Sequence, residues 1–104
     1  MERLPQKIKV DKVRLGEFCR NNHIVRLSFF GSVLRDDFSS DSDIDVLVDF
    51  EDGHTPGFLR VAQIERELSV LLDNRKVDLR TFRDLSGYFR KEVLAAAEVQ
   101  YAQA

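Results

Sequence analysis

Residues 43–50, DIDVLVDF, constrain the fold more than any other stretch, because apolar and polar side chains alternate along most of it. Successive side chains of a β-strand point to opposite faces of the sheet. Ile44 and Val46 therefore share one face with the apolar residues that follow at the same spacing. Asp43 and Asp45 share the other face, with their Cα atoms roughly 6.5 Å apart. The pattern predicts a strand that buries one face in the core and holds two carboxylates together on the other.

The rest of the chain divides into helix-like and strand-like segments. Helical spacing of apolar residues predicts helices at 10–22, 58–73 and 85–104, Ser32 opens a short helix, and β-branched and aromatic residues predict strands at 24–30 and 75–82. This order predicts an α/β (α+β) fold, a small mixed sheet with packed helices. The chain has 104 residues, which fits a single domain over 1–104.

Several side chains have an expected place in these elements. Asp11 is positioned to cap the first helix. Phe58 begins the apolar stripe of the helix at 58–73, and Leu94 and Tyr101 extend the stripe of the C-terminal helix. Cys19 is the only cysteine, so we expect a small core residue, with no internal disulfide and no thiolate zinc site.

Charge and hydropathy argue against several functional classes. The formal net charge of -2 lacks the basic excess typical of non-specific nucleic-acid binding. No apolar run approaches the roughly 20 residues that span a membrane. The charged N-terminus lacks the apolar core of a signal peptide. The expected location is the cytoplasm.

A third carboxylate is available to the acidic pair. Asp78 alternates with apolar neighbours in the strand predicted at 75–82, and it can join Asp43 and Asp45 if the two strands are adjacent. Carboxylates held this close repel one another unless one is protonated or a cation binds. Oxygen ligands suit Mg²⁺ or Mn²⁺, and three converging carboxylates can hold two ions about 3.5–4 Å apart for phosphoryl displacement.

A Gly-Ser pair ends the first predicted strand, ten residues before the acidic pair. Gly31 allows a ligand to approach the backbone closely. Ser32 opens a helix whose free N–H groups favour phosphate. Arg35, one helical turn later, and Arg80, on the same strand face as Asp78, are candidates either for phosphate contacts or for surface salt bridges.

The same residues also have simpler explanations. Aspartates at strand ends are often solvated charges, and a Gly-Ser pair is often an ordinary turn and helix cap. The run from Asp41 begins like an EF-hand calcium loop, but Val46 occupies the position where that loop requires Gly. The remaining acidic residues, Glu51 among them, and both histidines, His23 and His54, are expected to be surface side chains.

The combination resembles the nucleotidyltransferase superfamily related to DNA polymerase β. The resemblance rests on Gly31-Ser32, then ten residues, then Asp43-Ile44-Asp45, and on Asp78 in a third strand. It extends over most of the chain and implies a polymerase β-like palm core. The short chain is similar to the minimal branch, the MNT proteins, which are commonly the antitoxin half of HEPN/MNT toxin–antitoxin pairs.

The resemblance implies a role for each matching residue. Asp43, Asp45 and Asp78 would hold two Mg²⁺ ions, and Asp78 would also help to deprotonate the attacking hydroxyl. Gly31 and Ser32 would hold the nucleoside triphosphate. The implied reaction transfers AMP from ATP to a hydroxyl and releases pyrophosphate. In MNT antitoxins that hydroxyl resembles a tyrosine on the HEPN toxin.

Three functions are consistent with these features. The first is an antitoxin that modifies a partner HEPN toxin with AMP. The second is a nucleotidyltransferase for a small-molecule or RNA-end acceptor, although so short a chain has little room for an acceptor site. The third is a non-catalytic antitoxin that neutralises its toxin by binding. The C-terminal helix is also a candidate contact for a partner or for a second copy of the chain.

Overall fold

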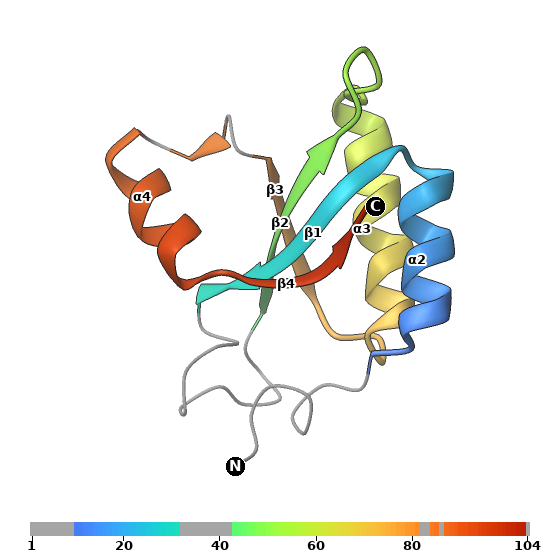
Figure 1. Ribbon diagram of the computed structural model, residues 1–104. Helices are drawn as coiled ribbons and strands as arrows, with labels where there is room; N and C mark the ends of the chain where they lie inside the picture. Colours follow the sequence, from blue (N-terminus) through green and yellow to red (C-terminus); the bar gives the residue numbers. More distant parts are fainter. Residues whose placement is uncertain (1–9, 32–42, 82–83, 86, 104) are drawn as a thin grey trace.

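The computed structural model describes residues 10–31, 43–81, 84, 85 and 87–103, and these form a mixed α/β structure around one sheet (Figure 1). The elements are α2 (Lys12–Asn21), β1 (Ile24–Phe30), β2 (Ile44–Phe50), α3 (Phe58–Leu71), β3 (Val77–Thr81), α4 (Gly87–Ala96) and β4 (Glu98–Ala102). The short helix predicted from Ser32 lies outside the described residues. No helix within the described ranges is long and apolar enough to cross a membrane.

The sheet is mixed, as the sequence predicts. Its four strands lie in the order β3-β2-β1-β4. The central strand β2 pairs in parallel with β3 and antiparallel with β1, and β1 pairs antiparallel with β4. The three strands predicted from the sequence are therefore direct neighbours, and the strand that carries Asp45 lies between the other two.

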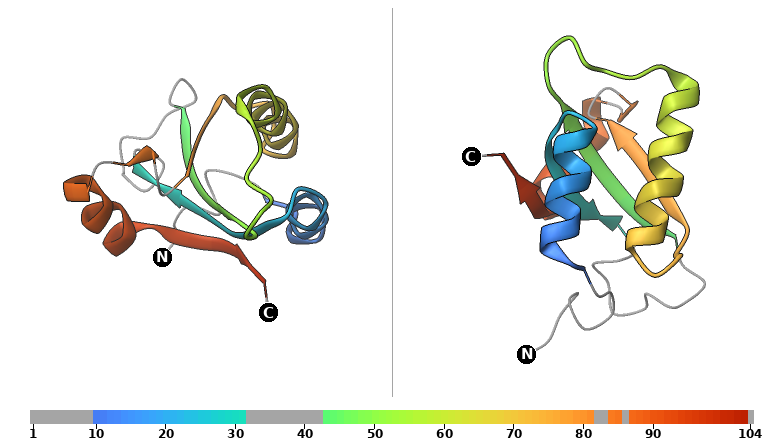
Figure 2. Two further views of the ribbon diagram at one scale, coloured as in Figure 1. Left: turned by 90° about the horizontal axis from the view of Figure 1, so that it is seen from above. Right: turned by 90° about the vertical axis from the view of Figure 1, so that its right-hand side faces the viewer.

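Helices cover the two faces of the sheet unequally. Helices α2 and α3 lie side by side on one face, and α4 lies on the other (Figure 2). The predicted apolar face of β2 is confirmed, because Ile44 and Val46 are fully buried against the two-helix layer. The buried core on this side is formed by Leu15, Phe18, Cys19, Ile24, Leu27, Phe29, Ile44, Val46, Val48, Ile64, Leu68, Leu72, Val77 and Leu79.

A smaller apolar cluster lies on the opposite face of the sheet. Leu47 and Phe30 pack there with Val93 of α4 and with Leu85. The face that carries Asp45 is therefore not uniformly polar. It is acidic at Asp45, near the start of β2, and apolar at Leu47, two residues later on the same face, where α4 covers it.

The helix ends agree with the sequence in one case and differ in another. The Asp11 side chain accepts hydrogen bonds from the backbone N–H groups of Val13 and Arg14 at 3.1 and 3.2 Å, which confirms the predicted cap. Phe58 was expected in the core but is 89% exposed. It is the first residue of α3, and the fully buried part of the helix begins only at Ile64.

The prediction of a helix over 85–104 is wrong in its second half. Helix α4 ends at Ala96, and residues Glu98–Ala102 form β4 against β1. A helix to the end of the chain would leave the β1 edge unpaired, and pairing it satisfies that row of backbone groups. Tyr101 consequently packs against the main core from a strand, and Leu94 is 48% exposed.

Candidate functional site

Two predicted site aspartates lie opposite each other on neighbouring strands. The parallel register of β2 and β3 pairs Asp45 with Asp78, and the antiparallel register of β1 and β2 pairs Asp45 with Phe30. Paired residues of adjacent strands point to the same face and lie about 4.8 Å apart. Asp43 immediately precedes β2, and all three aspartates are half-buried. The strand pairing thus brings the three carboxylates to one end of the sheet, where β2 and β3 begin.

Gly31 brings the backbone against the Asp45 carboxylate. It follows the last residue of β1 and has φ +74°, a conformation that side chains other than Gly rarely adopt. A Cβ atom built at this position would collide with Oδ2 of Asp45. The group that approaches the Gly31 backbone here is the Asp45 side chain, and the approach of a ligand expected from the sequence stays a prediction. The other predicted phosphate contacts, Ser32 and Arg35, lie outside the described residues.

Arg80 is paired with Asp78 rather than directed away from it. The guanidinium donates from Nε to one Asp78 oxygen at 3.2 Å and from an Nη atom to the other at 3.1 Å. The hydrogen bonds and charge of Asp78 raise the pKa of Arg80, and the charges of Asp84 and Asp45 act in the same direction. Of the two predicted alternatives, the structure shows the salt bridge; phosphate contact stays a prediction.

The donor set fits a hard divalent cation. Asp43, Asp45 and Asp78 offer carboxylate oxygens, which Mg²⁺ and Mn²⁺ prefer. A cationic group already lies on Asp78, so this edge of the sheet accommodates positive charge. The three carboxylates are neighbours but are not gathered to ligand spacing: within the described residues, the one metal-ligating trio with ligand atoms all within 4.8 Å lies elsewhere.

A cleft of about 590 Å³ runs along the outer edge of β3 and reaches Asp78. This volume lies in the usual range for ligand sites. The Glu65 carboxylate of α3 accepts the Leu79 N–H at 2.8 Å and so satisfies a backbone donor of the edge strand. The cleft is lined by Phe50, Thr55, Pro56, Phe58, Val61, Ala62, Glu65, Asp78, Leu79, Arg80, Thr81 and Asp84.

A trio that the sequence did not group lies at the other end of the sheet. His23, Glu51 and His54 come together where β1 begins and β2 ends. Both histidines are exposed, as predicted, but they are neighbours in space. The signal that could have joined them is the antiparallel pairing of β1 with β2, which places the residue before β1 opposite the residue after β2.

Comparison with known proteins gives consistent results. The model of the family described as nucleotidyltransferase domain matches residues 12–99. A protein adenylyltransferase, MntA, from Thermococcus cleftensis is 40% identical over 68 residues, which are 65% of this chain and 66% of that protein.

Solved structures share the fold. A structure described as a minimal nucleotidyltransferase has 36% sequence identity and a TM-score of 0.68, with 83% of this chain and 85% of that chain covered. A chain from the complex of a tri-AMPylated Shewanella oneidensis HEPN toxin with an MNT antitoxin has 20% identity and a TM-score of 0.63, with 88% of this chain and 70% of that chain covered. The second likeness concerns the fold alone.

Proposed function

Because the chain is an enzyme of the nucleotidyltransferase domain family, we propose that it transfers AMP from ATP to a hydroxyl of a partner protein and thereby acts as an antitoxin. The observation that carries this proposal is the strand register that sets Asp45 opposite Asp78, with Gly31 against the Asp45 carboxylate. A relative named a protein adenylyltransferase gives further support, and the fold is shared with a chain from the complex of an AMPylated HEPN toxin with an MNT antitoxin.

Each residue at this edge has a proposed task. Asp43, Asp45 and Asp78 would hold two Mg²⁺ ions, or Mn²⁺, which when bound neutralise charge on the phosphate oxygens. Gly31 leaves room for the Asp45 carboxylate beside the backbone, and Gly31 and Ser32 would bind the triphosphate. The acceptor oxygen forms a bond to the α-phosphorus, the bond to the bridging oxygen breaks, and pyrophosphate leaves.

The two residues of the salt bridge have linked roles in this proposal. Asp78 accepts the proton of the attacking hydroxyl. Arg80 already lies beside the site and would pair with phosphate oxygens when the Asp78 carboxylate takes up a metal ion. The salt bridge therefore balances charge at this edge before the nucleotide binds.

The proposed acceptor is a tyrosine of a HEPN-type toxin. In this proposal the toxin presents the hydroxyl to the aspartates. Phe58 and Leu59 are 89% and 79% exposed at the start of α3, beside the cleft that reaches Asp78. Large exposed apolar side chains of this kind are typical of protein-binding surfaces.

The test combines the chain with the protein encoded by the neighbouring gene, ATP and Mg²⁺, and records the intact mass of both proteins. We expect AMP-sized additions to the partner, absent from the Asp43→Asn/Asp45→Asn variant. Asp49→Asn is the matched control, because Asp49 lies on β2 near its other end and is 3.9 Å from Arg26. A tight complex without added mass would favour an antitoxin that acts by binding alone. If the partner gains no mass and no complex forms, a small-molecule or RNA-end acceptor is favoured.

A further inference from the structure

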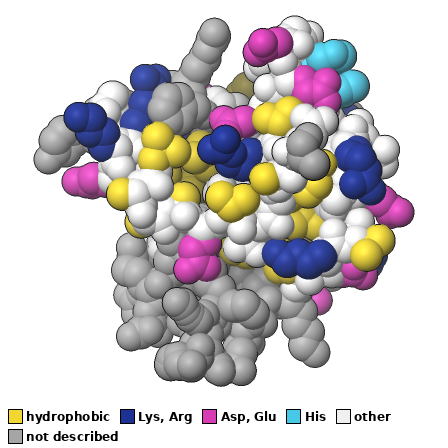
Figure 3. All heavy atoms as spheres, viewed as in Figure 1, with side chains coloured by type: hydrophobic (Ala, Val, Ile, Leu, Met, Phe, Trp, Pro, Cys, Tyr) yellow, Lys and Arg dark blue, Asp and Glu magenta, His cyan; other side chains and the backbone are white. Residues whose placement is uncertain are grey.

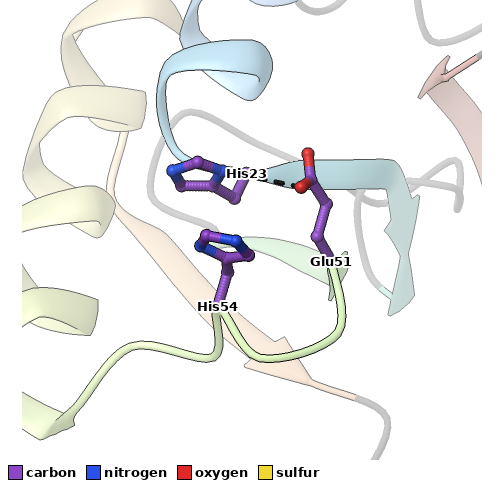
Figure 4. A group of neighbouring side chains, drawn as sticks. All are labelled: His23, Glu51 and His54. Carbon is purple, nitrogen blue, oxygen red and sulfur yellow. Dashed lines mark ion pairs between the residues drawn. The ribbon is translucent and has the colours of Figure 1, made fainter.

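His23, Glu51 and His54 form a compact group at the end of the sheet away from the aspartates (Figure 4). One ligand atom from each side chain, an imidazole nitrogen or a carboxylate oxygen, lies within 4.8 Å of the other two. The two histidines are the only ones in the chain and are visible at the surface in Figure 3. We call this group the histidine trio.

Backbone hydrogen bonds fix the three residues relative to one another. The Glu51 N–H donates to the His23 carbonyl at 2.8 Å, and the His54 N–H donates to the Glu51 carbonyl at 3.0 Å. His23 has φ +58°, so the turn between α2 and β1 holds its backbone in the left-handed region. The strand pairing and the turn therefore position the three residues through their backbones.

The side chains already lie near the spacing that a metal requires. The two imidazole rings are stacked with centroids 4.0 Å apart, and Nδ1 of His23 lies 3.7 Å from a Glu51 carboxylate oxygen. Two nitrogens bound to one tetrahedral Zn²⁺ at about 2.1 Å lie about 3.4 Å apart. The rings must tilt from their stack to aim both lone pairs at one ion. Both are exposed, so the rotation meets little packing.

We infer that the histidine trio binds a divalent transition-metal ion, with Zn²⁺ as the best match. Two imidazoles and one carboxylate form a donor set that suits Zn²⁺, and similar sets accept Ni²⁺ or Co²⁺, with water completing the coordination. Mg²⁺ prefers oxygen ligands and is a poor match. The site is separate from the aspartates, because the length of β2 puts about 20 Å between Asp45 and Glu51.

The bound ion would link the loop between β2 and α3, which lines part of the cleft, to the turn before β1. Glu51 and His54 belong to the segment between β2 and α3, whereas His23 belongs to the turn before β1. Thr55 and Pro56, which follow in the same segment, line the cleft that reaches Asp78. An ion that joins the two segments therefore stabilises one wall of the cleft. This inference does not depend on the proposed transfer of AMP.

The experiment titrates Zn²⁺ into the full chain, purified without a polyhistidine tag and stripped of metal, near neutral pH. With excess Mg²⁺ present to occupy the proposed aspartate site, we expect calorimetry to show one Zn²⁺ ion bound per chain, and we expect the NMR signals of both imidazoles to shift together. Cys19 is fully buried and does not compete. The matched variants are His23→Asn, because Asn tolerates the left-handed backbone, and His54→Gln.

Each histidine variant should lose at least about tenfold in Zn²⁺ affinity, the smallest loss usual when the surroundings of a metal site are altered. The Asp43→Asn/Asp45→Asn variant should bind Zn²⁺ as tightly as the unaltered chain. The inference is overturned if the chain does not bind Zn²⁺, if the imidazole signals stay in place, or if the aspartate variant loses the ion while the histidine variants keep it.

Discussion

A methyl group added at Gly31 tests whether the site depends on the close approach of the backbone to Asp45. The chain offers a matched control, since Gly31 and Gly53 have nearly equal φ values of +74° and +80°. Alanine at either position carries the same backbone cost, about 1–2 kcal/mol. The two positions differ in surroundings: the added carbon meets the Asp45 carboxylate at Gly31 but has no heavy atom within 4 Å at Gly53.

The expected changes in Tm and in the rate of AMP transfer follow from that difference. For a domain of this size each kcal/mol lowers Tm by about 4–8 °C, so Gly31→Ala and Gly53→Ala should fall in Tm by similar amounts. The carboxylate is the mobile end of its side chain, so Asp45 can turn aside at little cost to the fold. A group misplaced by about 1 Å can cost about 100-fold in rate. We expect Gly31→Ala alone to lose AMP transfer by about that factor.

The assay measures Tm by differential scanning calorimetry and AMP transfer from labelled ATP at a temperature where both variants are folded. Equal loss of transfer in the two variants would mean that activity follows stability and not the Asp45 contact. Full activity in Gly31→Ala would refute the reasoning, because a site that tolerates the methyl group does not need the glycine.

Three further perturbations test the pairing and burial of single groups. Arg80→Ala removes the cation that competes for Asp78, so the Mg²⁺ concentration for half-maximal transfer should fall while KM for ATP rises. Burial raises the pKa of the Cys19 thiol from 9.0 to about 12, so native protein should resist alkylation at neutral pH. Because only the unfolded thiol ionises between those values, the free energy of unfolding should fall by up to about 4 kcal/mol from pH 9 to 12. Denaturant titrations of the unaltered chain and of Cys19→Ala across this pH range measure the effect. The same pH dependence of the unfolding free energy in both proteins would contradict it. Glu65→Ala leaves the Leu79 N–H without its carboxylate acceptor and should cost about 1 kcal/mol in denaturant unfolding, whereas Glu65→Gln keeps an acceptor and should cost less.

The strands could be predicted because their sequences specify both a period and a face. In residues 43–50 the alternation identifies the buried side chains, and the fully buried Ile44 and Val46 confirm it. The adjacency of Asp78 to the acidic pair required one assumption, that the third strand lies beside the second, and the parallel register of β2 and β3 confirms it. The metal and phosphate roles of these residues stay predictions.

The elements that could not be predicted depend on contacts between distant parts of the chain. Residues Glu98–Ala102 continue an alanine-rich helical stretch, and only the unpaired edge of β1 favours a strand there. The histidine trio joins residues that are 31 positions apart at its extremes, from His23 to His54, so it appears only once β1 and β2 are paired. Local sequence preference contains neither piece of information.

Charge balance explains how this small domain can hold an acidic edge and still fold. Asp45 and Asp78 lie about one strand spacing apart, so two ionised carboxylates there would repel each other strongly. The two-point salt bridge from Arg80 offsets part of that repulsion within the same strand. A metal ion that binds Asp78 must then compete with this guanidinium. The salt bridge therefore stabilises this end of the sheet, and an Arg80 side chain displaced by a metal ion would be able to contact phosphate.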